Sequence, residues 1–450
     1  MGIFNIPTEI KYILNKINEC GYESYLVGGC VRDFLLGKIP SDYDVTTNAL
    51  PQTVMDIFKD SAYVVGTGLS HGTVTVVKDG VSAEVTTFRI DGNYSDSRHP
   101  ESVRFSSSLK DDVLRRDFTV NSMAYSECDG FKDYVGGIAD LENGIIRCVG
   151  DPYLRFDEDA LRILRALRFS SVLGFEIEEK TSEAIFEKAH LLKNISKERI
   201  AVEFVKLLCG KNAENILLKY RDIIAVFIPE IVPMFDFEQH TPYHKYDVYT
   251  HSVKATVAAD KGDKMLRLAA YFHDIGKPSC FVTDENGVGH FYGHAKSSME
   301  ITDSVLKNLR FDNKLRLGVL ELIKNHDAPI EDEGKRIKRL LGNLGAEQFF
   351  RLLKLQRADN AAQSEKVFNR RERFDRVEKA AEKLIEENVC FSLSDLKIRG
   401  GDLISLGIPA GKTIGSILNR LLEDVIEDRV MNDREKLLVR ALEYKGEYQW

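Results

Sequence analysis

Three groups of residues in this chain have types and spacings that could do chemistry, and the first is the carboxylate pair of Asp42-Tyr43-Asp44. Alternate side chains of a β-strand lie on one face, so a strand here would place Asp42 and Asp44 side by side. Two such carboxylates can hold Mg²⁺ ions that activate a hydroxyl group and neutralise a leaving phosphate group. Glu84 alternates with apolar residues in the next expected hairpin and could complete the set. Taken alone, an Asp-x-Asp pair also fits a turn or a solvated strand edge.

A glycine pair precedes these carboxylates. Gly28-Gly29 follows the apolar run Tyr25-Leu26-Val27 and begins a segment that we expect to be a helix containing Arg32. Glycines at such a turn let backbone N–H groups approach a phosphate, and the helix N-terminus and an arginine add positive charge. A tight turn without any ligand has the same pattern. The short spacing from Arg32 to Asp42 favours a phosphate-binding turn beside a metal site.

The second group is a set of charged residues at steps of three or four: Glu158, Asp159, Arg162, Arg165 and Arg168. On one helix these residues would share a broad face, while Leu161, Leu164 and Leu167 would face the core. A solvated face with an ion pair between Glu158 and Arg162 is the structural alternative.

The third group is an ordered series of imidazoles and carboxylates: His251, His273, Asp274, His294, His326 and Asp359. Neutral imidazole nitrogens and carboxylate oxygens suit Mn²⁺, Fe²⁺, Ni²⁺, Co²⁺ or Zn²⁺, and the adjacent pair His273-Asp274 can offer two ligands to one site. A lone histidine is more often a surface or core residue, but a series of four around this pair favours a metal site.

The elements that must position these groups change in type along the chain. From Tyr25 to about Gly150, short β-branched runs lie among helical stretches, and Lys78-Asp79-Gly80 between two such runs predicts a hairpin turn. Beyond Asp151 the apolar residues recur at helical spacing, so we expect only helices there. Seven of the ten histidines lie between His240 and His326, which indicates a separate domain that begins near Asp236. We therefore expect an α+β protein with four domains, over residues 1–150, 151–235, 236–365 and 366–450.

Length and composition limit the class of protein. A chain of 450 residues is too long for one hydrophobic core, and its 43% hydrophobic and 29% charged residues are ordinary for a globular protein. No apolar run is long enough to span a bilayer, and the seven cysteines are scattered without a CxxC pair, so we expect a cytoplasmic protein with free thiols and no membrane partner. The net charge of −8 means that any contact with nucleic acid must be local.

Five ordered motifs in the first 210 residues resemble the polymerase-β-type head of bacterial CCA-adding enzymes and their poly(A) polymerase relatives. The motifs are Gly28-Gly29-x-x-Arg32-Asp33, Asp42-x-Asp44, Arg115 to Asn121, Glu158-Asp159-x-x-Arg162 and Ser196 to Ile200. The resemblance implies a mixed α/β nucleotidyltransferase head with a small sheet, followed by all-α neck and tail domains. It also implies that tRNA, CTP and ATP are the partners and that Mg²⁺ is the cofactor.

The same resemblance assigns roles to the residues. Asp42 and Asp44 would carry the metals, with Glu84 as a third carboxylate. Four further residues would bind the triphosphate and the nucleotide: Gly28, Gly29, Arg32 and Arg116. Asp159 and Arg162 would hydrogen-bond the Watson–Crick edge of C or A in place of a template, and Arg165 and Arg168 would neutralise phosphates.

The histidine series, centred on Ala270 to Lys277 and closed by Asp359, resembles an HD phosphohydrolase domain. His294 and His326 resemble the extra ligands of two-metal members, which would hold Mn²⁺, Ni²⁺, Co²⁺ or Fe²⁺ and hydrolyse a 2′,3′-cyclic phosphate or a phosphomonoester. A folded but silent scaffold is the alternative. The glycine-containing turns near Gly400 and Gly411 resemble a tRNA-binding tail, although plain turns between helices have the same pattern. Arg370, Arg371, Arg373 and Arg376 are interleaved with acids, which favours a solvated helix face.

The polar segment from Phe88 to Pro100 predicts a loop, which relatives that add the terminal A keep and relatives that add only C lack; a surface hairpin is the alternative. We therefore expect addition of C and A to tRNA 3′ ends. Poly(A) addition, or addition of A alone, shares almost every motif. A hydrolase with a nucleotide-sensing head and a non-catalytic RNA-binding protein are further alternatives, and both are disfavoured by the intact acidic and arginine motifs.

Overall fold

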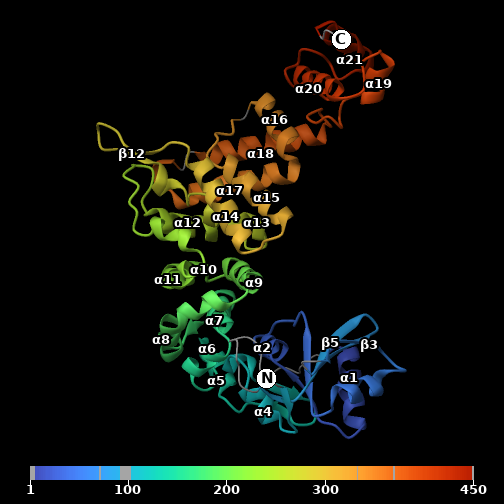
Figure 1. Ribbon diagram of the computed structural model, residues 1–450, viewed down its shortest axis with the longest axis vertical. Helices are drawn as coiled ribbons and strands as arrows, with labels where there is room; N and C mark the ends of the chain where they lie inside the picture. The colour runs from blue at the N-terminus through green and yellow to red at the C-terminus, as the bar shows by residue number, and fades with distance from the viewer. Residues whose placement is uncertain (1–5, 70–71, 92–102, 332, 368–369, 448–450) are drawn as a thin grey trace. The chain divides into compact units, whose positions relative to one another are not determined.

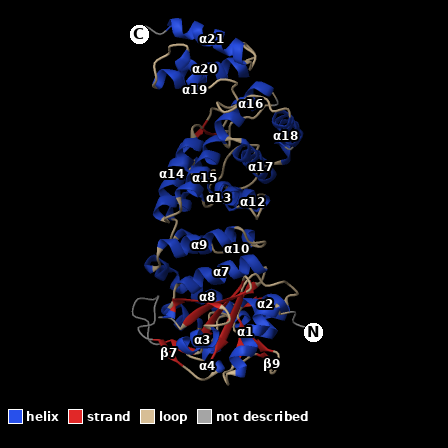
Figure 2. Ribbon diagram, turned by 90° about the vertical axis from the view of Figure 1, so that its right-hand side faces the viewer, coloured by secondary structure: helices blue, strands red, loops and turns tan. Residues whose placement is uncertain are grey.

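The computed structural model describes residues 6–69, 72–91, 103–331, 333–367 and 370–447. The chain divides into two compact units, Met1–Pro229 and Glu230–Trp450 (Figure 1). Each unit has its own buried apolar residues. The finer division into four domains stays a prediction. The expected fold class is confirmed, because a mixed sheet and helices form the beginning of the first unit and helices dominate the remainder (Figure 2).

A seven-stranded sheet organises the first unit. Its spatial order is β3-β4-β5-β2-β1-β8-β9, in which β2 and β5 run parallel and the other neighbours run antiparallel. The strands are β1 (Ser24–Val27), β2 (Tyr43–Thr47), β3 (Tyr63–Gly68), β4 (Thr73–Lys78), β5 (Val81–Thr87), β8 (Ala124–Ser126) and β9 (Gly130–Lys132). Short pairs are formed by β6 (Arg89–Asp91) with β7 (Val103–Phe105) and by β10 (Ile145–Ile146) with β11 (Glu176–Ile177).

The turn between β4 and β5 confirms the predicted hairpin. Lys78 pairs with Val81, so Asp79 and Gly80 form a two-residue connection. Their φ angles of 47° and 85° both lie in the left-handed region, which is the conformation that an Asp-Gly hairpin turn needs. On its other side β5 pairs with the parallel strand β2, where Glu84 lies opposite Asp44.

The helices of the first unit fall into two sets. Those around the sheet are α1 (Thr8–Glu19), α2 (Gly29–Leu35), α3 (Pro51–Phe58), α4 (Leu109–Leu114) and α5 (Gly137–Asn143). Those that follow are α6 (Pro152–Glu158), α7 (Leu161–Leu173), α8 (Glu179–Lys188), α9 (Lys197–Leu208), α10 (Ala213–Lys219) and α11 (Arg221–Ala225). The α7 helix packs against α9 and α10, and its expected core residues Leu161, Leu164 and Leu167 are buried.

The second unit is mainly helical. Its helices are α12 (Val248–Ala258), α13 (Lys264–Phe272), α14 (His294–Asn308), α15 (Asn313–Asn325), α16 (Gly334–Leu344), α17 (Ala346–Ala362), α18 (Arg370–Glu386), α19 (Gly400–Ser405), α20 (Lys412–Ile426) and α21 (Arg434–Glu447). Aspartates begin three of them, because Asp247, Asp263 and Asp312 accept hydrogen bonds from backbone N–H groups of the first turns. The packed helices α12, α13, α14, α15 and α17 carry the histidine series.

The expectation of helices alone beyond Asp151 was wrong in two places. The strand β11 lies in the first unit and pairs with β10, which precedes Asp151. In the second unit, a hairpin of β12 (Phe281–Thr283) and β13 (Gly289–Phe291) interrupts the helices. Its turn is stabilised by Asp284, whose Oδ1 accepts from the N–H groups of Asn286 and Val288, and by Gly287 with φ of 75°. Strands of two or three residues are too short to give a periodic signal in the sequence. No helix in the described part of the chain has the length and apolar character to cross a membrane.

Three helices, α19, α20 and α21, enclose a separate apolar cluster around Leu403, Leu421 and Leu437. Gly400 begins α19, and Lys412 begins α20 as an exposed residue. The glycines thus lie at connections between helices, and a role of this segment in tRNA binding stays a prediction.

Candidate active sites

A cavity of about 840 Å³ in the first unit collects most of the residues predicted to bind a nucleotide. Those that line it are Gly28, Gly29, Arg32, Asp42, Asp44, Arg116, Asp159, Arg162, Arg165 and Arg168. Glu84 is not among the lining residues. Arg89, Arg115, Asp117 and Arg199 also line it; they lie in segments singled out in the sequence but were given no role there. Ser41 and Phe169 were missed by the sequence interpretation. The predicted loop after Phe88 begins and ends in the paired strands β6 and β7, and its residues 92–102 lie outside the described part of the chain.

The turn at Gly28 brings backbone and charged side chains close together. Gly28 has a φ of 80° and is the residue before α2, where a β-carbon would lie 3.3 Å from Arg116 Nη1 and 3.6 Å from Asp44 Oδ2. A side chain here would be strained by the positive φ and would crowd both charged groups. The glycine therefore allows the backbone at the start of α2 to approach a ligand held between Asp44 and Arg116.

The three predicted carboxylates are held in different ways. Asp44 lies in β2 and is partly buried, whereas Asp42 precedes the strand at a bend and is exposed, so the expectation that both lie within one strand was wrong. Glu84 is the register partner of Asp44 in β5 and is also exposed. Burial, together with the nearby charges of Glu84 and Asp42, raises the pKa of Asp44 to about 6 although Arg116 opposes the shift. A divalent cation bound here would offset the negative charge that Asp42 and Glu84 add beside Asp44, and carboxylate oxygens are ligands that Mg²⁺ accepts.

Arg116 is oriented by Asp112, which the sequence interpretation missed. The Asp112 carboxylate is fully buried and accepts hydrogen bonds from Arg116 Nη2 at 3.1 Å, Arg115 Nε at 2.9 Å and Thr46 Oγ1 at 3.2 Å. Burial alone would raise the pKa of Asp112, but the two arginines lower it, so the carboxylate stays ionised. The four-residue spacing from Asp112 to Arg116 on a helix was the signal that could have identified this pair.

Asp159 and Arg162, which the resemblance assigns to base selection, do not lie on one continuous helix. The α6 helix ends at Glu158, Asp159 has extended backbone angles, and α7 begins at Leu161, so the expected single charged face was wrong. The break is stabilised by Asp159 Oδ1, which accepts from the Leu161 N–H at 3.0 Å, while its Oδ2 accepts from Arg199 at 2.9 Å. Arg162 is buried and donates to Glu158 at 2.5 Å, which is the ion pair that the structural alternative predicted.

Two other arginines in the cavity are held by buried carboxylates from distant parts of the chain. Arg165 Nε donates to Asp117 at 2.7 Å, and Arg168 Nε lies 2.6 Å from Glu203 of α9. The Arg168 guanidinium also stacks on Phe169, with its carbon 3.7 Å from the ring centre. The cavity is therefore a cationic surface whose arginines are fixed before any ligand binds, which suits a polyphosphate.

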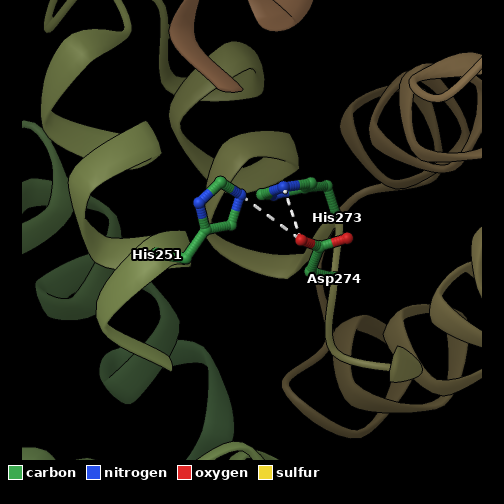
Figure 3. A group of neighbouring side chains, drawn as sticks. All are labelled: His251, His273 and Asp274. Carbon is green, nitrogen blue, oxygen red and sulfur yellow. Dashed lines mark ion pairs between the residues drawn. The ribbon is translucent and has the colours of Figure 1, made fainter. Parts of the chain in front are cut away.

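The second unit brings the predicted histidine series together at one place. His251 of α12 comes close to His273 and Asp274, which follow α13 (Figure 3). The His251 Nε2 atom lies 2.9 Å from Asp359 and 3.4 Å from Asp274, and His273 Nε2 lies 3.1 Å from Asp274. On the other side of Asp274, His294 and His326 have their Nε2 atoms 3.2 Å apart. Asp274 is thus shared by two three-residue groups, which are His251–His273–Asp274 and Asp274–His294–His326.

The orientation of these side chains fits metal ions. The Nδ1 atoms of His273, His294 and His326 face backbone carbonyl oxygens at 2.7–2.9 Å, so each Nε2 is free to act as a ligand. Within the described residues, His251 Nε2, His273 Nε2 and both oxygens of Asp274 are buried without an aligned hydrogen bond. Buried lone pairs that converge without hydrogen bonds are costly unless a cation satisfies them. The donor set of imidazoles and carboxylates suits a transition metal.

The pKa shifts within the cluster also indicate that its carboxylates favour nearby positive charge. Burial alone would lower the pKa of His273, but Asp274 and Asp359 raise it to about 10. The same contacts lower the pKa of Asp274 and of Asp359 below the usual range, against the effect of burial. Both carboxylates therefore favour positive charge beside them, which a bound metal ion would supply.

A cavity of about 610 Å³ opens onto this cluster. Of the predicted ligands, Asp274, His294, His326 and Asp359 line it. The sequence interpretation missed His244 and Lys277, which also line it; Lys277 Nζ lies 2.7 Å from Asp274. Burial and the charge of Lys277 lower the pKa of His244, so its imidazole is neutral. Arg370 and Arg373 of α18 reach this cavity as well, although we expected them only on a solvated helix face.

Three families of known sequences match successive parts of the chain. Residues 24–147 match a family described as "Poly A polymerase head domain", residues 174–235 match "Probable RNA and SrmB- binding site of polymerase A", and residues 285–441 match the second domain of tRNA nucleotidyltransferases.

The CCA-adding enzyme of Ligilactobacillus salivarius is 32% identical over 447 residues, which cover 98% of each chain. That of Leuconostoc mesenteroides is 32% identical over 454 residues, covering 99% of each chain. The crystal structure of the Bacillus stearothermophilus CCA-adding enzyme in complex with CTP is similar over 97% of each chain, with a TM-score of 0.75 and 28% identity.

Proposed function

This chain belongs to the family of CCA-adding enzymes, and from that premise we propose that its first unit adds C and A to the 3′ end of tRNA without a template, using CTP and ATP. The observation that carries the proposal is the cavity in which Gly28, Asp44 and a set of fixed arginines converge. Relatives named as CCA-adding enzymes match nearly the whole length of the chain, which favours complete CCA addition over addition of A alone or of poly(A).

The reaction is a transfer of a nucleotidyl group. The 3′-hydroxyl oxygen of the tRNA forms a bond to the α-phosphorus of the nucleotide, the bond from that phosphorus to the leaving oxygen breaks, and pyrophosphate departs. A divalent cation, which we propose to be Mg²⁺ held by Asp42, Asp44 and Glu84, would favour loss of the hydroxyl proton and neutralise the pyrophosphate. Arg32, Arg116 and the backbone at Gly29 orient the triphosphate, and Asp112 fixes the guanidinium of Arg116.

Base selection is proposed for Asp159 and Arg162. The two residues face the same cavity from either side of the break between α6 and α7. Carboxylate oxygens accept and guanidinium N–H groups donate, so together they can complement the polar edges of C and A. The ion pair between Arg162 and Glu158 must open or be shared when the base binds, because it uses one of the donors that would read the base.

The test is incubation of the purified protein with a tRNA that lacks its last three nucleotides. We expect CTP alone to extend the tRNA by two nucleotides, and CTP with ATP to extend it by three. Extension by many A residues with ATP alone would support the poly(A) alternative, and extension only of a tRNA that already ends in CC would support addition of A alone.

A second function is favoured by the histidine cluster in the second unit. We propose that it is a metal-dependent phosphohydrolase site for a 2′,3′-cyclic phosphate or a phosphomonoester, with a transition metal held by His251, His273, Asp274 and Asp359. His294 and His326 would hold a second ion with Asp274. A water oxygen forms a bond to phosphorus, the ester bond to the ribose oxygen breaks, and one water proton passes to that oxygen. Lys277 beside Asp274 would hold the phosphate in place.

This second proposal is tested with the metal-loaded protein and adenosine 2′,3′-cyclic phosphate. Hydrolysis with Mn²⁺, Ni²⁺, Co²⁺ or Fe²⁺ that is lost in His273→Ala would support it. Absence of hydrolysis with every one of these metals would leave the cluster as a structural scaffold. None of the seven cysteines, all in the described part of the chain, forms a disulfide, which supports our further proposal that the protein works in the reducing cytoplasm.

A further inference from the structure

We propose that the cavity of the second unit binds the 3′-terminal nucleotide of a polynucleotide, with Arg370 and Arg373 holding the phosphate on the 5′ side of that nucleotide. This inference rests on the proposed phosphohydrolase function and specifies its substrate. The cavity of about 610 Å³ is wide enough for a nucleotide, and it joins the histidine cluster to the first turn of α18.

The two arginines form a cationic end to the cavity. Both lie in the first turn of α18, on the side of the helix that lines the cavity, and neither has an ion-pair partner in the described part of the chain. The Nε atom of Arg373 is buried there without a hydrogen-bond partner. By contrast, Arg357 of α17 binds the acidic residues Asp375 and Glu378 of α18 at 2.6 and 2.7 Å, so these acids do not neutralise the pair. Two arginines with unused donors beside a phosphate-hydrolysing centre suit a second phosphate group.

An aromatic pair marks the rim of the same cavity. The rings of His290 and Tyr292 are parallel, with 6° between their planes and 5.4 Å between their centres. Tyr292 is 75% exposed, an unusual state for so large a ring, while both residues line the cavity. Nucleobases stack on exposed aromatic rings without regard to sequence. The pair therefore provides a place for the base of the bound nucleotide.

The three features give the chemical class of the ligand. The reacting phosphate lies at the histidine cluster, the base stacks at Tyr292, and a phosphate on the 5′ side meets Arg370 and Arg373. A nucleoside 2′,3′-cyclic phosphate offers the first two groups only. An RNA end or a nucleoside that also carries a 5′-phosphate offers all three, and these two sources can be distinguished by experiment.

The test compares three substrates with the full-length, Mn²⁺-loaded protein: adenosine 2′,3′-cyclic phosphate, the same compound with a 5′-phosphate, and the dinucleotide ApA ending in a 2′,3′-cyclic phosphate. In the wild type we expect kcat/KM for the dinucleotide to exceed that for the mononucleoside by about 10- to 100-fold, since hydrogen bonds to charged groups have such effects. The double variant Arg370→Ala with Arg373→Ala should lose this preference, because only the two substrates with a phosphate on the 5′ side can contact these arginines. Lys379→Ala, an exposed charge change on α18 outside the cavity, should leave the preference unchanged.

Two further measurements keep the inference separate from the hydrolase proposal. Tyr292→Ala should raise KM for all three substrates by about tenfold, because each carries the stacked base. Binding of a fluorescent dinucleotide 3′-phosphate should weaken in the double arginine variant even if no metal supports turnover. If the 5′-phosphate alone raises kcat/KM as much as the dinucleotide does, the ligand is a free nucleotide. If only the dinucleotide raises kcat/KM, the ligand is an RNA end. Equal kcat/KM for all substrates in the wild type, or a preference that survives in the double variant, would overturn the inference.

Discussion

At the scale of single residues, the surroundings of Asp44 disfavour its ionised form unless a cation binds beside it. Its pKa of about 6 lies above the ordinary value of 3.8, mainly because of burial. A carboxyl group with a raised folded-state pKa contributes stability below its unfolded pKa, and this contribution is lost as the pH rises through the folded value. In metal-free protein at pH 7 the ionised Asp44 is therefore a cost.

We predict that Asp44→Asn has opposite effects on activity and on stability. Nucleotide addition should fall by about 10³-fold, as expected when charge that serves a transition state is removed. The free energy of unfolding of metal-free protein at pH 7 should rise by about 1–3 kcal/mol, because the neutral amide avoids the burial cost. Denaturant titration in EDTA and a tRNA extension assay measure the two effects, with the exposed Asp60→Asn as control. Addition at near the wild-type rate would contradict the metal role of Asp44.

We also predict that Asp159→Ala or Arg162→Ala impairs the choice of nucleotide more than it impairs turnover. Lost hydrogen bonds to charged groups are worth roughly 1.5–3 kcal/mol, so discrimination of CTP and ATP against UTP and GTP should fall by about ten- to a hundredfold. Competition assays with pairs of nucleotides measure the ratio. Glu158→Gln removes the negative charge that pairs with Arg162 but keeps Arg162 itself, so this variant should retain most of the discrimination. Unchanged discrimination in the two alanine variants would leave α7 with a structural, ion-paired face only.

The residues that could be predicted from the sequence are those within short motifs. Asp42, Asp44 and Arg116 lie in such motifs, and the cavity brings them together. The pairing of Asp117 with Arg165 could not be predicted in the same way, because the two residues are 48 positions apart and meet only through the fold. The sequence does not show whether a charged side chain pairs with a residue far along the chain or is solvated by water.

At the scale of elements, the helix break between α6 and α7 was invisible because the segment contains neither glycine nor proline. Asp159 ends one helix and caps the next through a single backbone hydrogen bond. Such a cap is a local signal, but the same residue types also occur inside helices. The β4–β5 hairpin was predictable for the opposite reason, since Asp-Gly between two β-branched runs has few other conformations.

One buried carboxylate should determine whether the last three helices hold together. Asp424 of α20 is 2% exposed and accepts hydrogen bonds from Arg440 at 2.8 Å, Arg429 at 3.2 Å and the Tyr444 hydroxyl. These hydrogen bonds lower its pKa, although burial alone would raise it. The carboxylate thus joins α20 to α21.

We predict that Asp424→Ala destabilises α19, α20 and α21 by about 2–3 kcal/mol. The loss stays below the about 3–5 kcal/mol of a fully buried pair because the arginines can reach water. Hydrogen exchange of backbone amides in these helices measures the effect, with the exposed Glu435→Ala as control. If this segment also holds tRNA, KM for tRNA should rise while KM for CTP stays constant. Unchanged exchange would show that the apolar cluster alone maintains the packing.

At the scale of the whole molecule, each compact unit contains one candidate site built from its own residues. The fold class and the order of the two candidate sites along the chain could be predicted, because the acidic motifs and the histidine series lie in separate stretches of sequence. The cavity that joins Arg370 and Arg373 to the histidine cluster could not, since α17 must first turn back into α18. Metal ligands can be recognised in a sequence by their residue types, whereas the residues that line a cavity are known only once the packing of the helices is known.

The last prediction is that the two sites work independently and require different metals. Oxygen ligands such as Asp42 and Asp44 suit Mg²⁺, and the histidine cluster suits a transition metal. His273→Ala with Asp274→Ala should therefore remove hydrolysis of 2′,3′-cyclic phosphate and leave nucleotide addition within about twofold of the wild type, a change too small to reflect a lost charged hydrogen bond. Asp42→Ala should do the reverse, with retained hydrolysis as the control for folding. Both activities are measured on each variant with Mg²⁺ alone and with Mn²⁺, and circular dichroism checks the fold. Loss of nucleotide addition in a folded His273 and Asp274 double variant would show that the two sites are coupled.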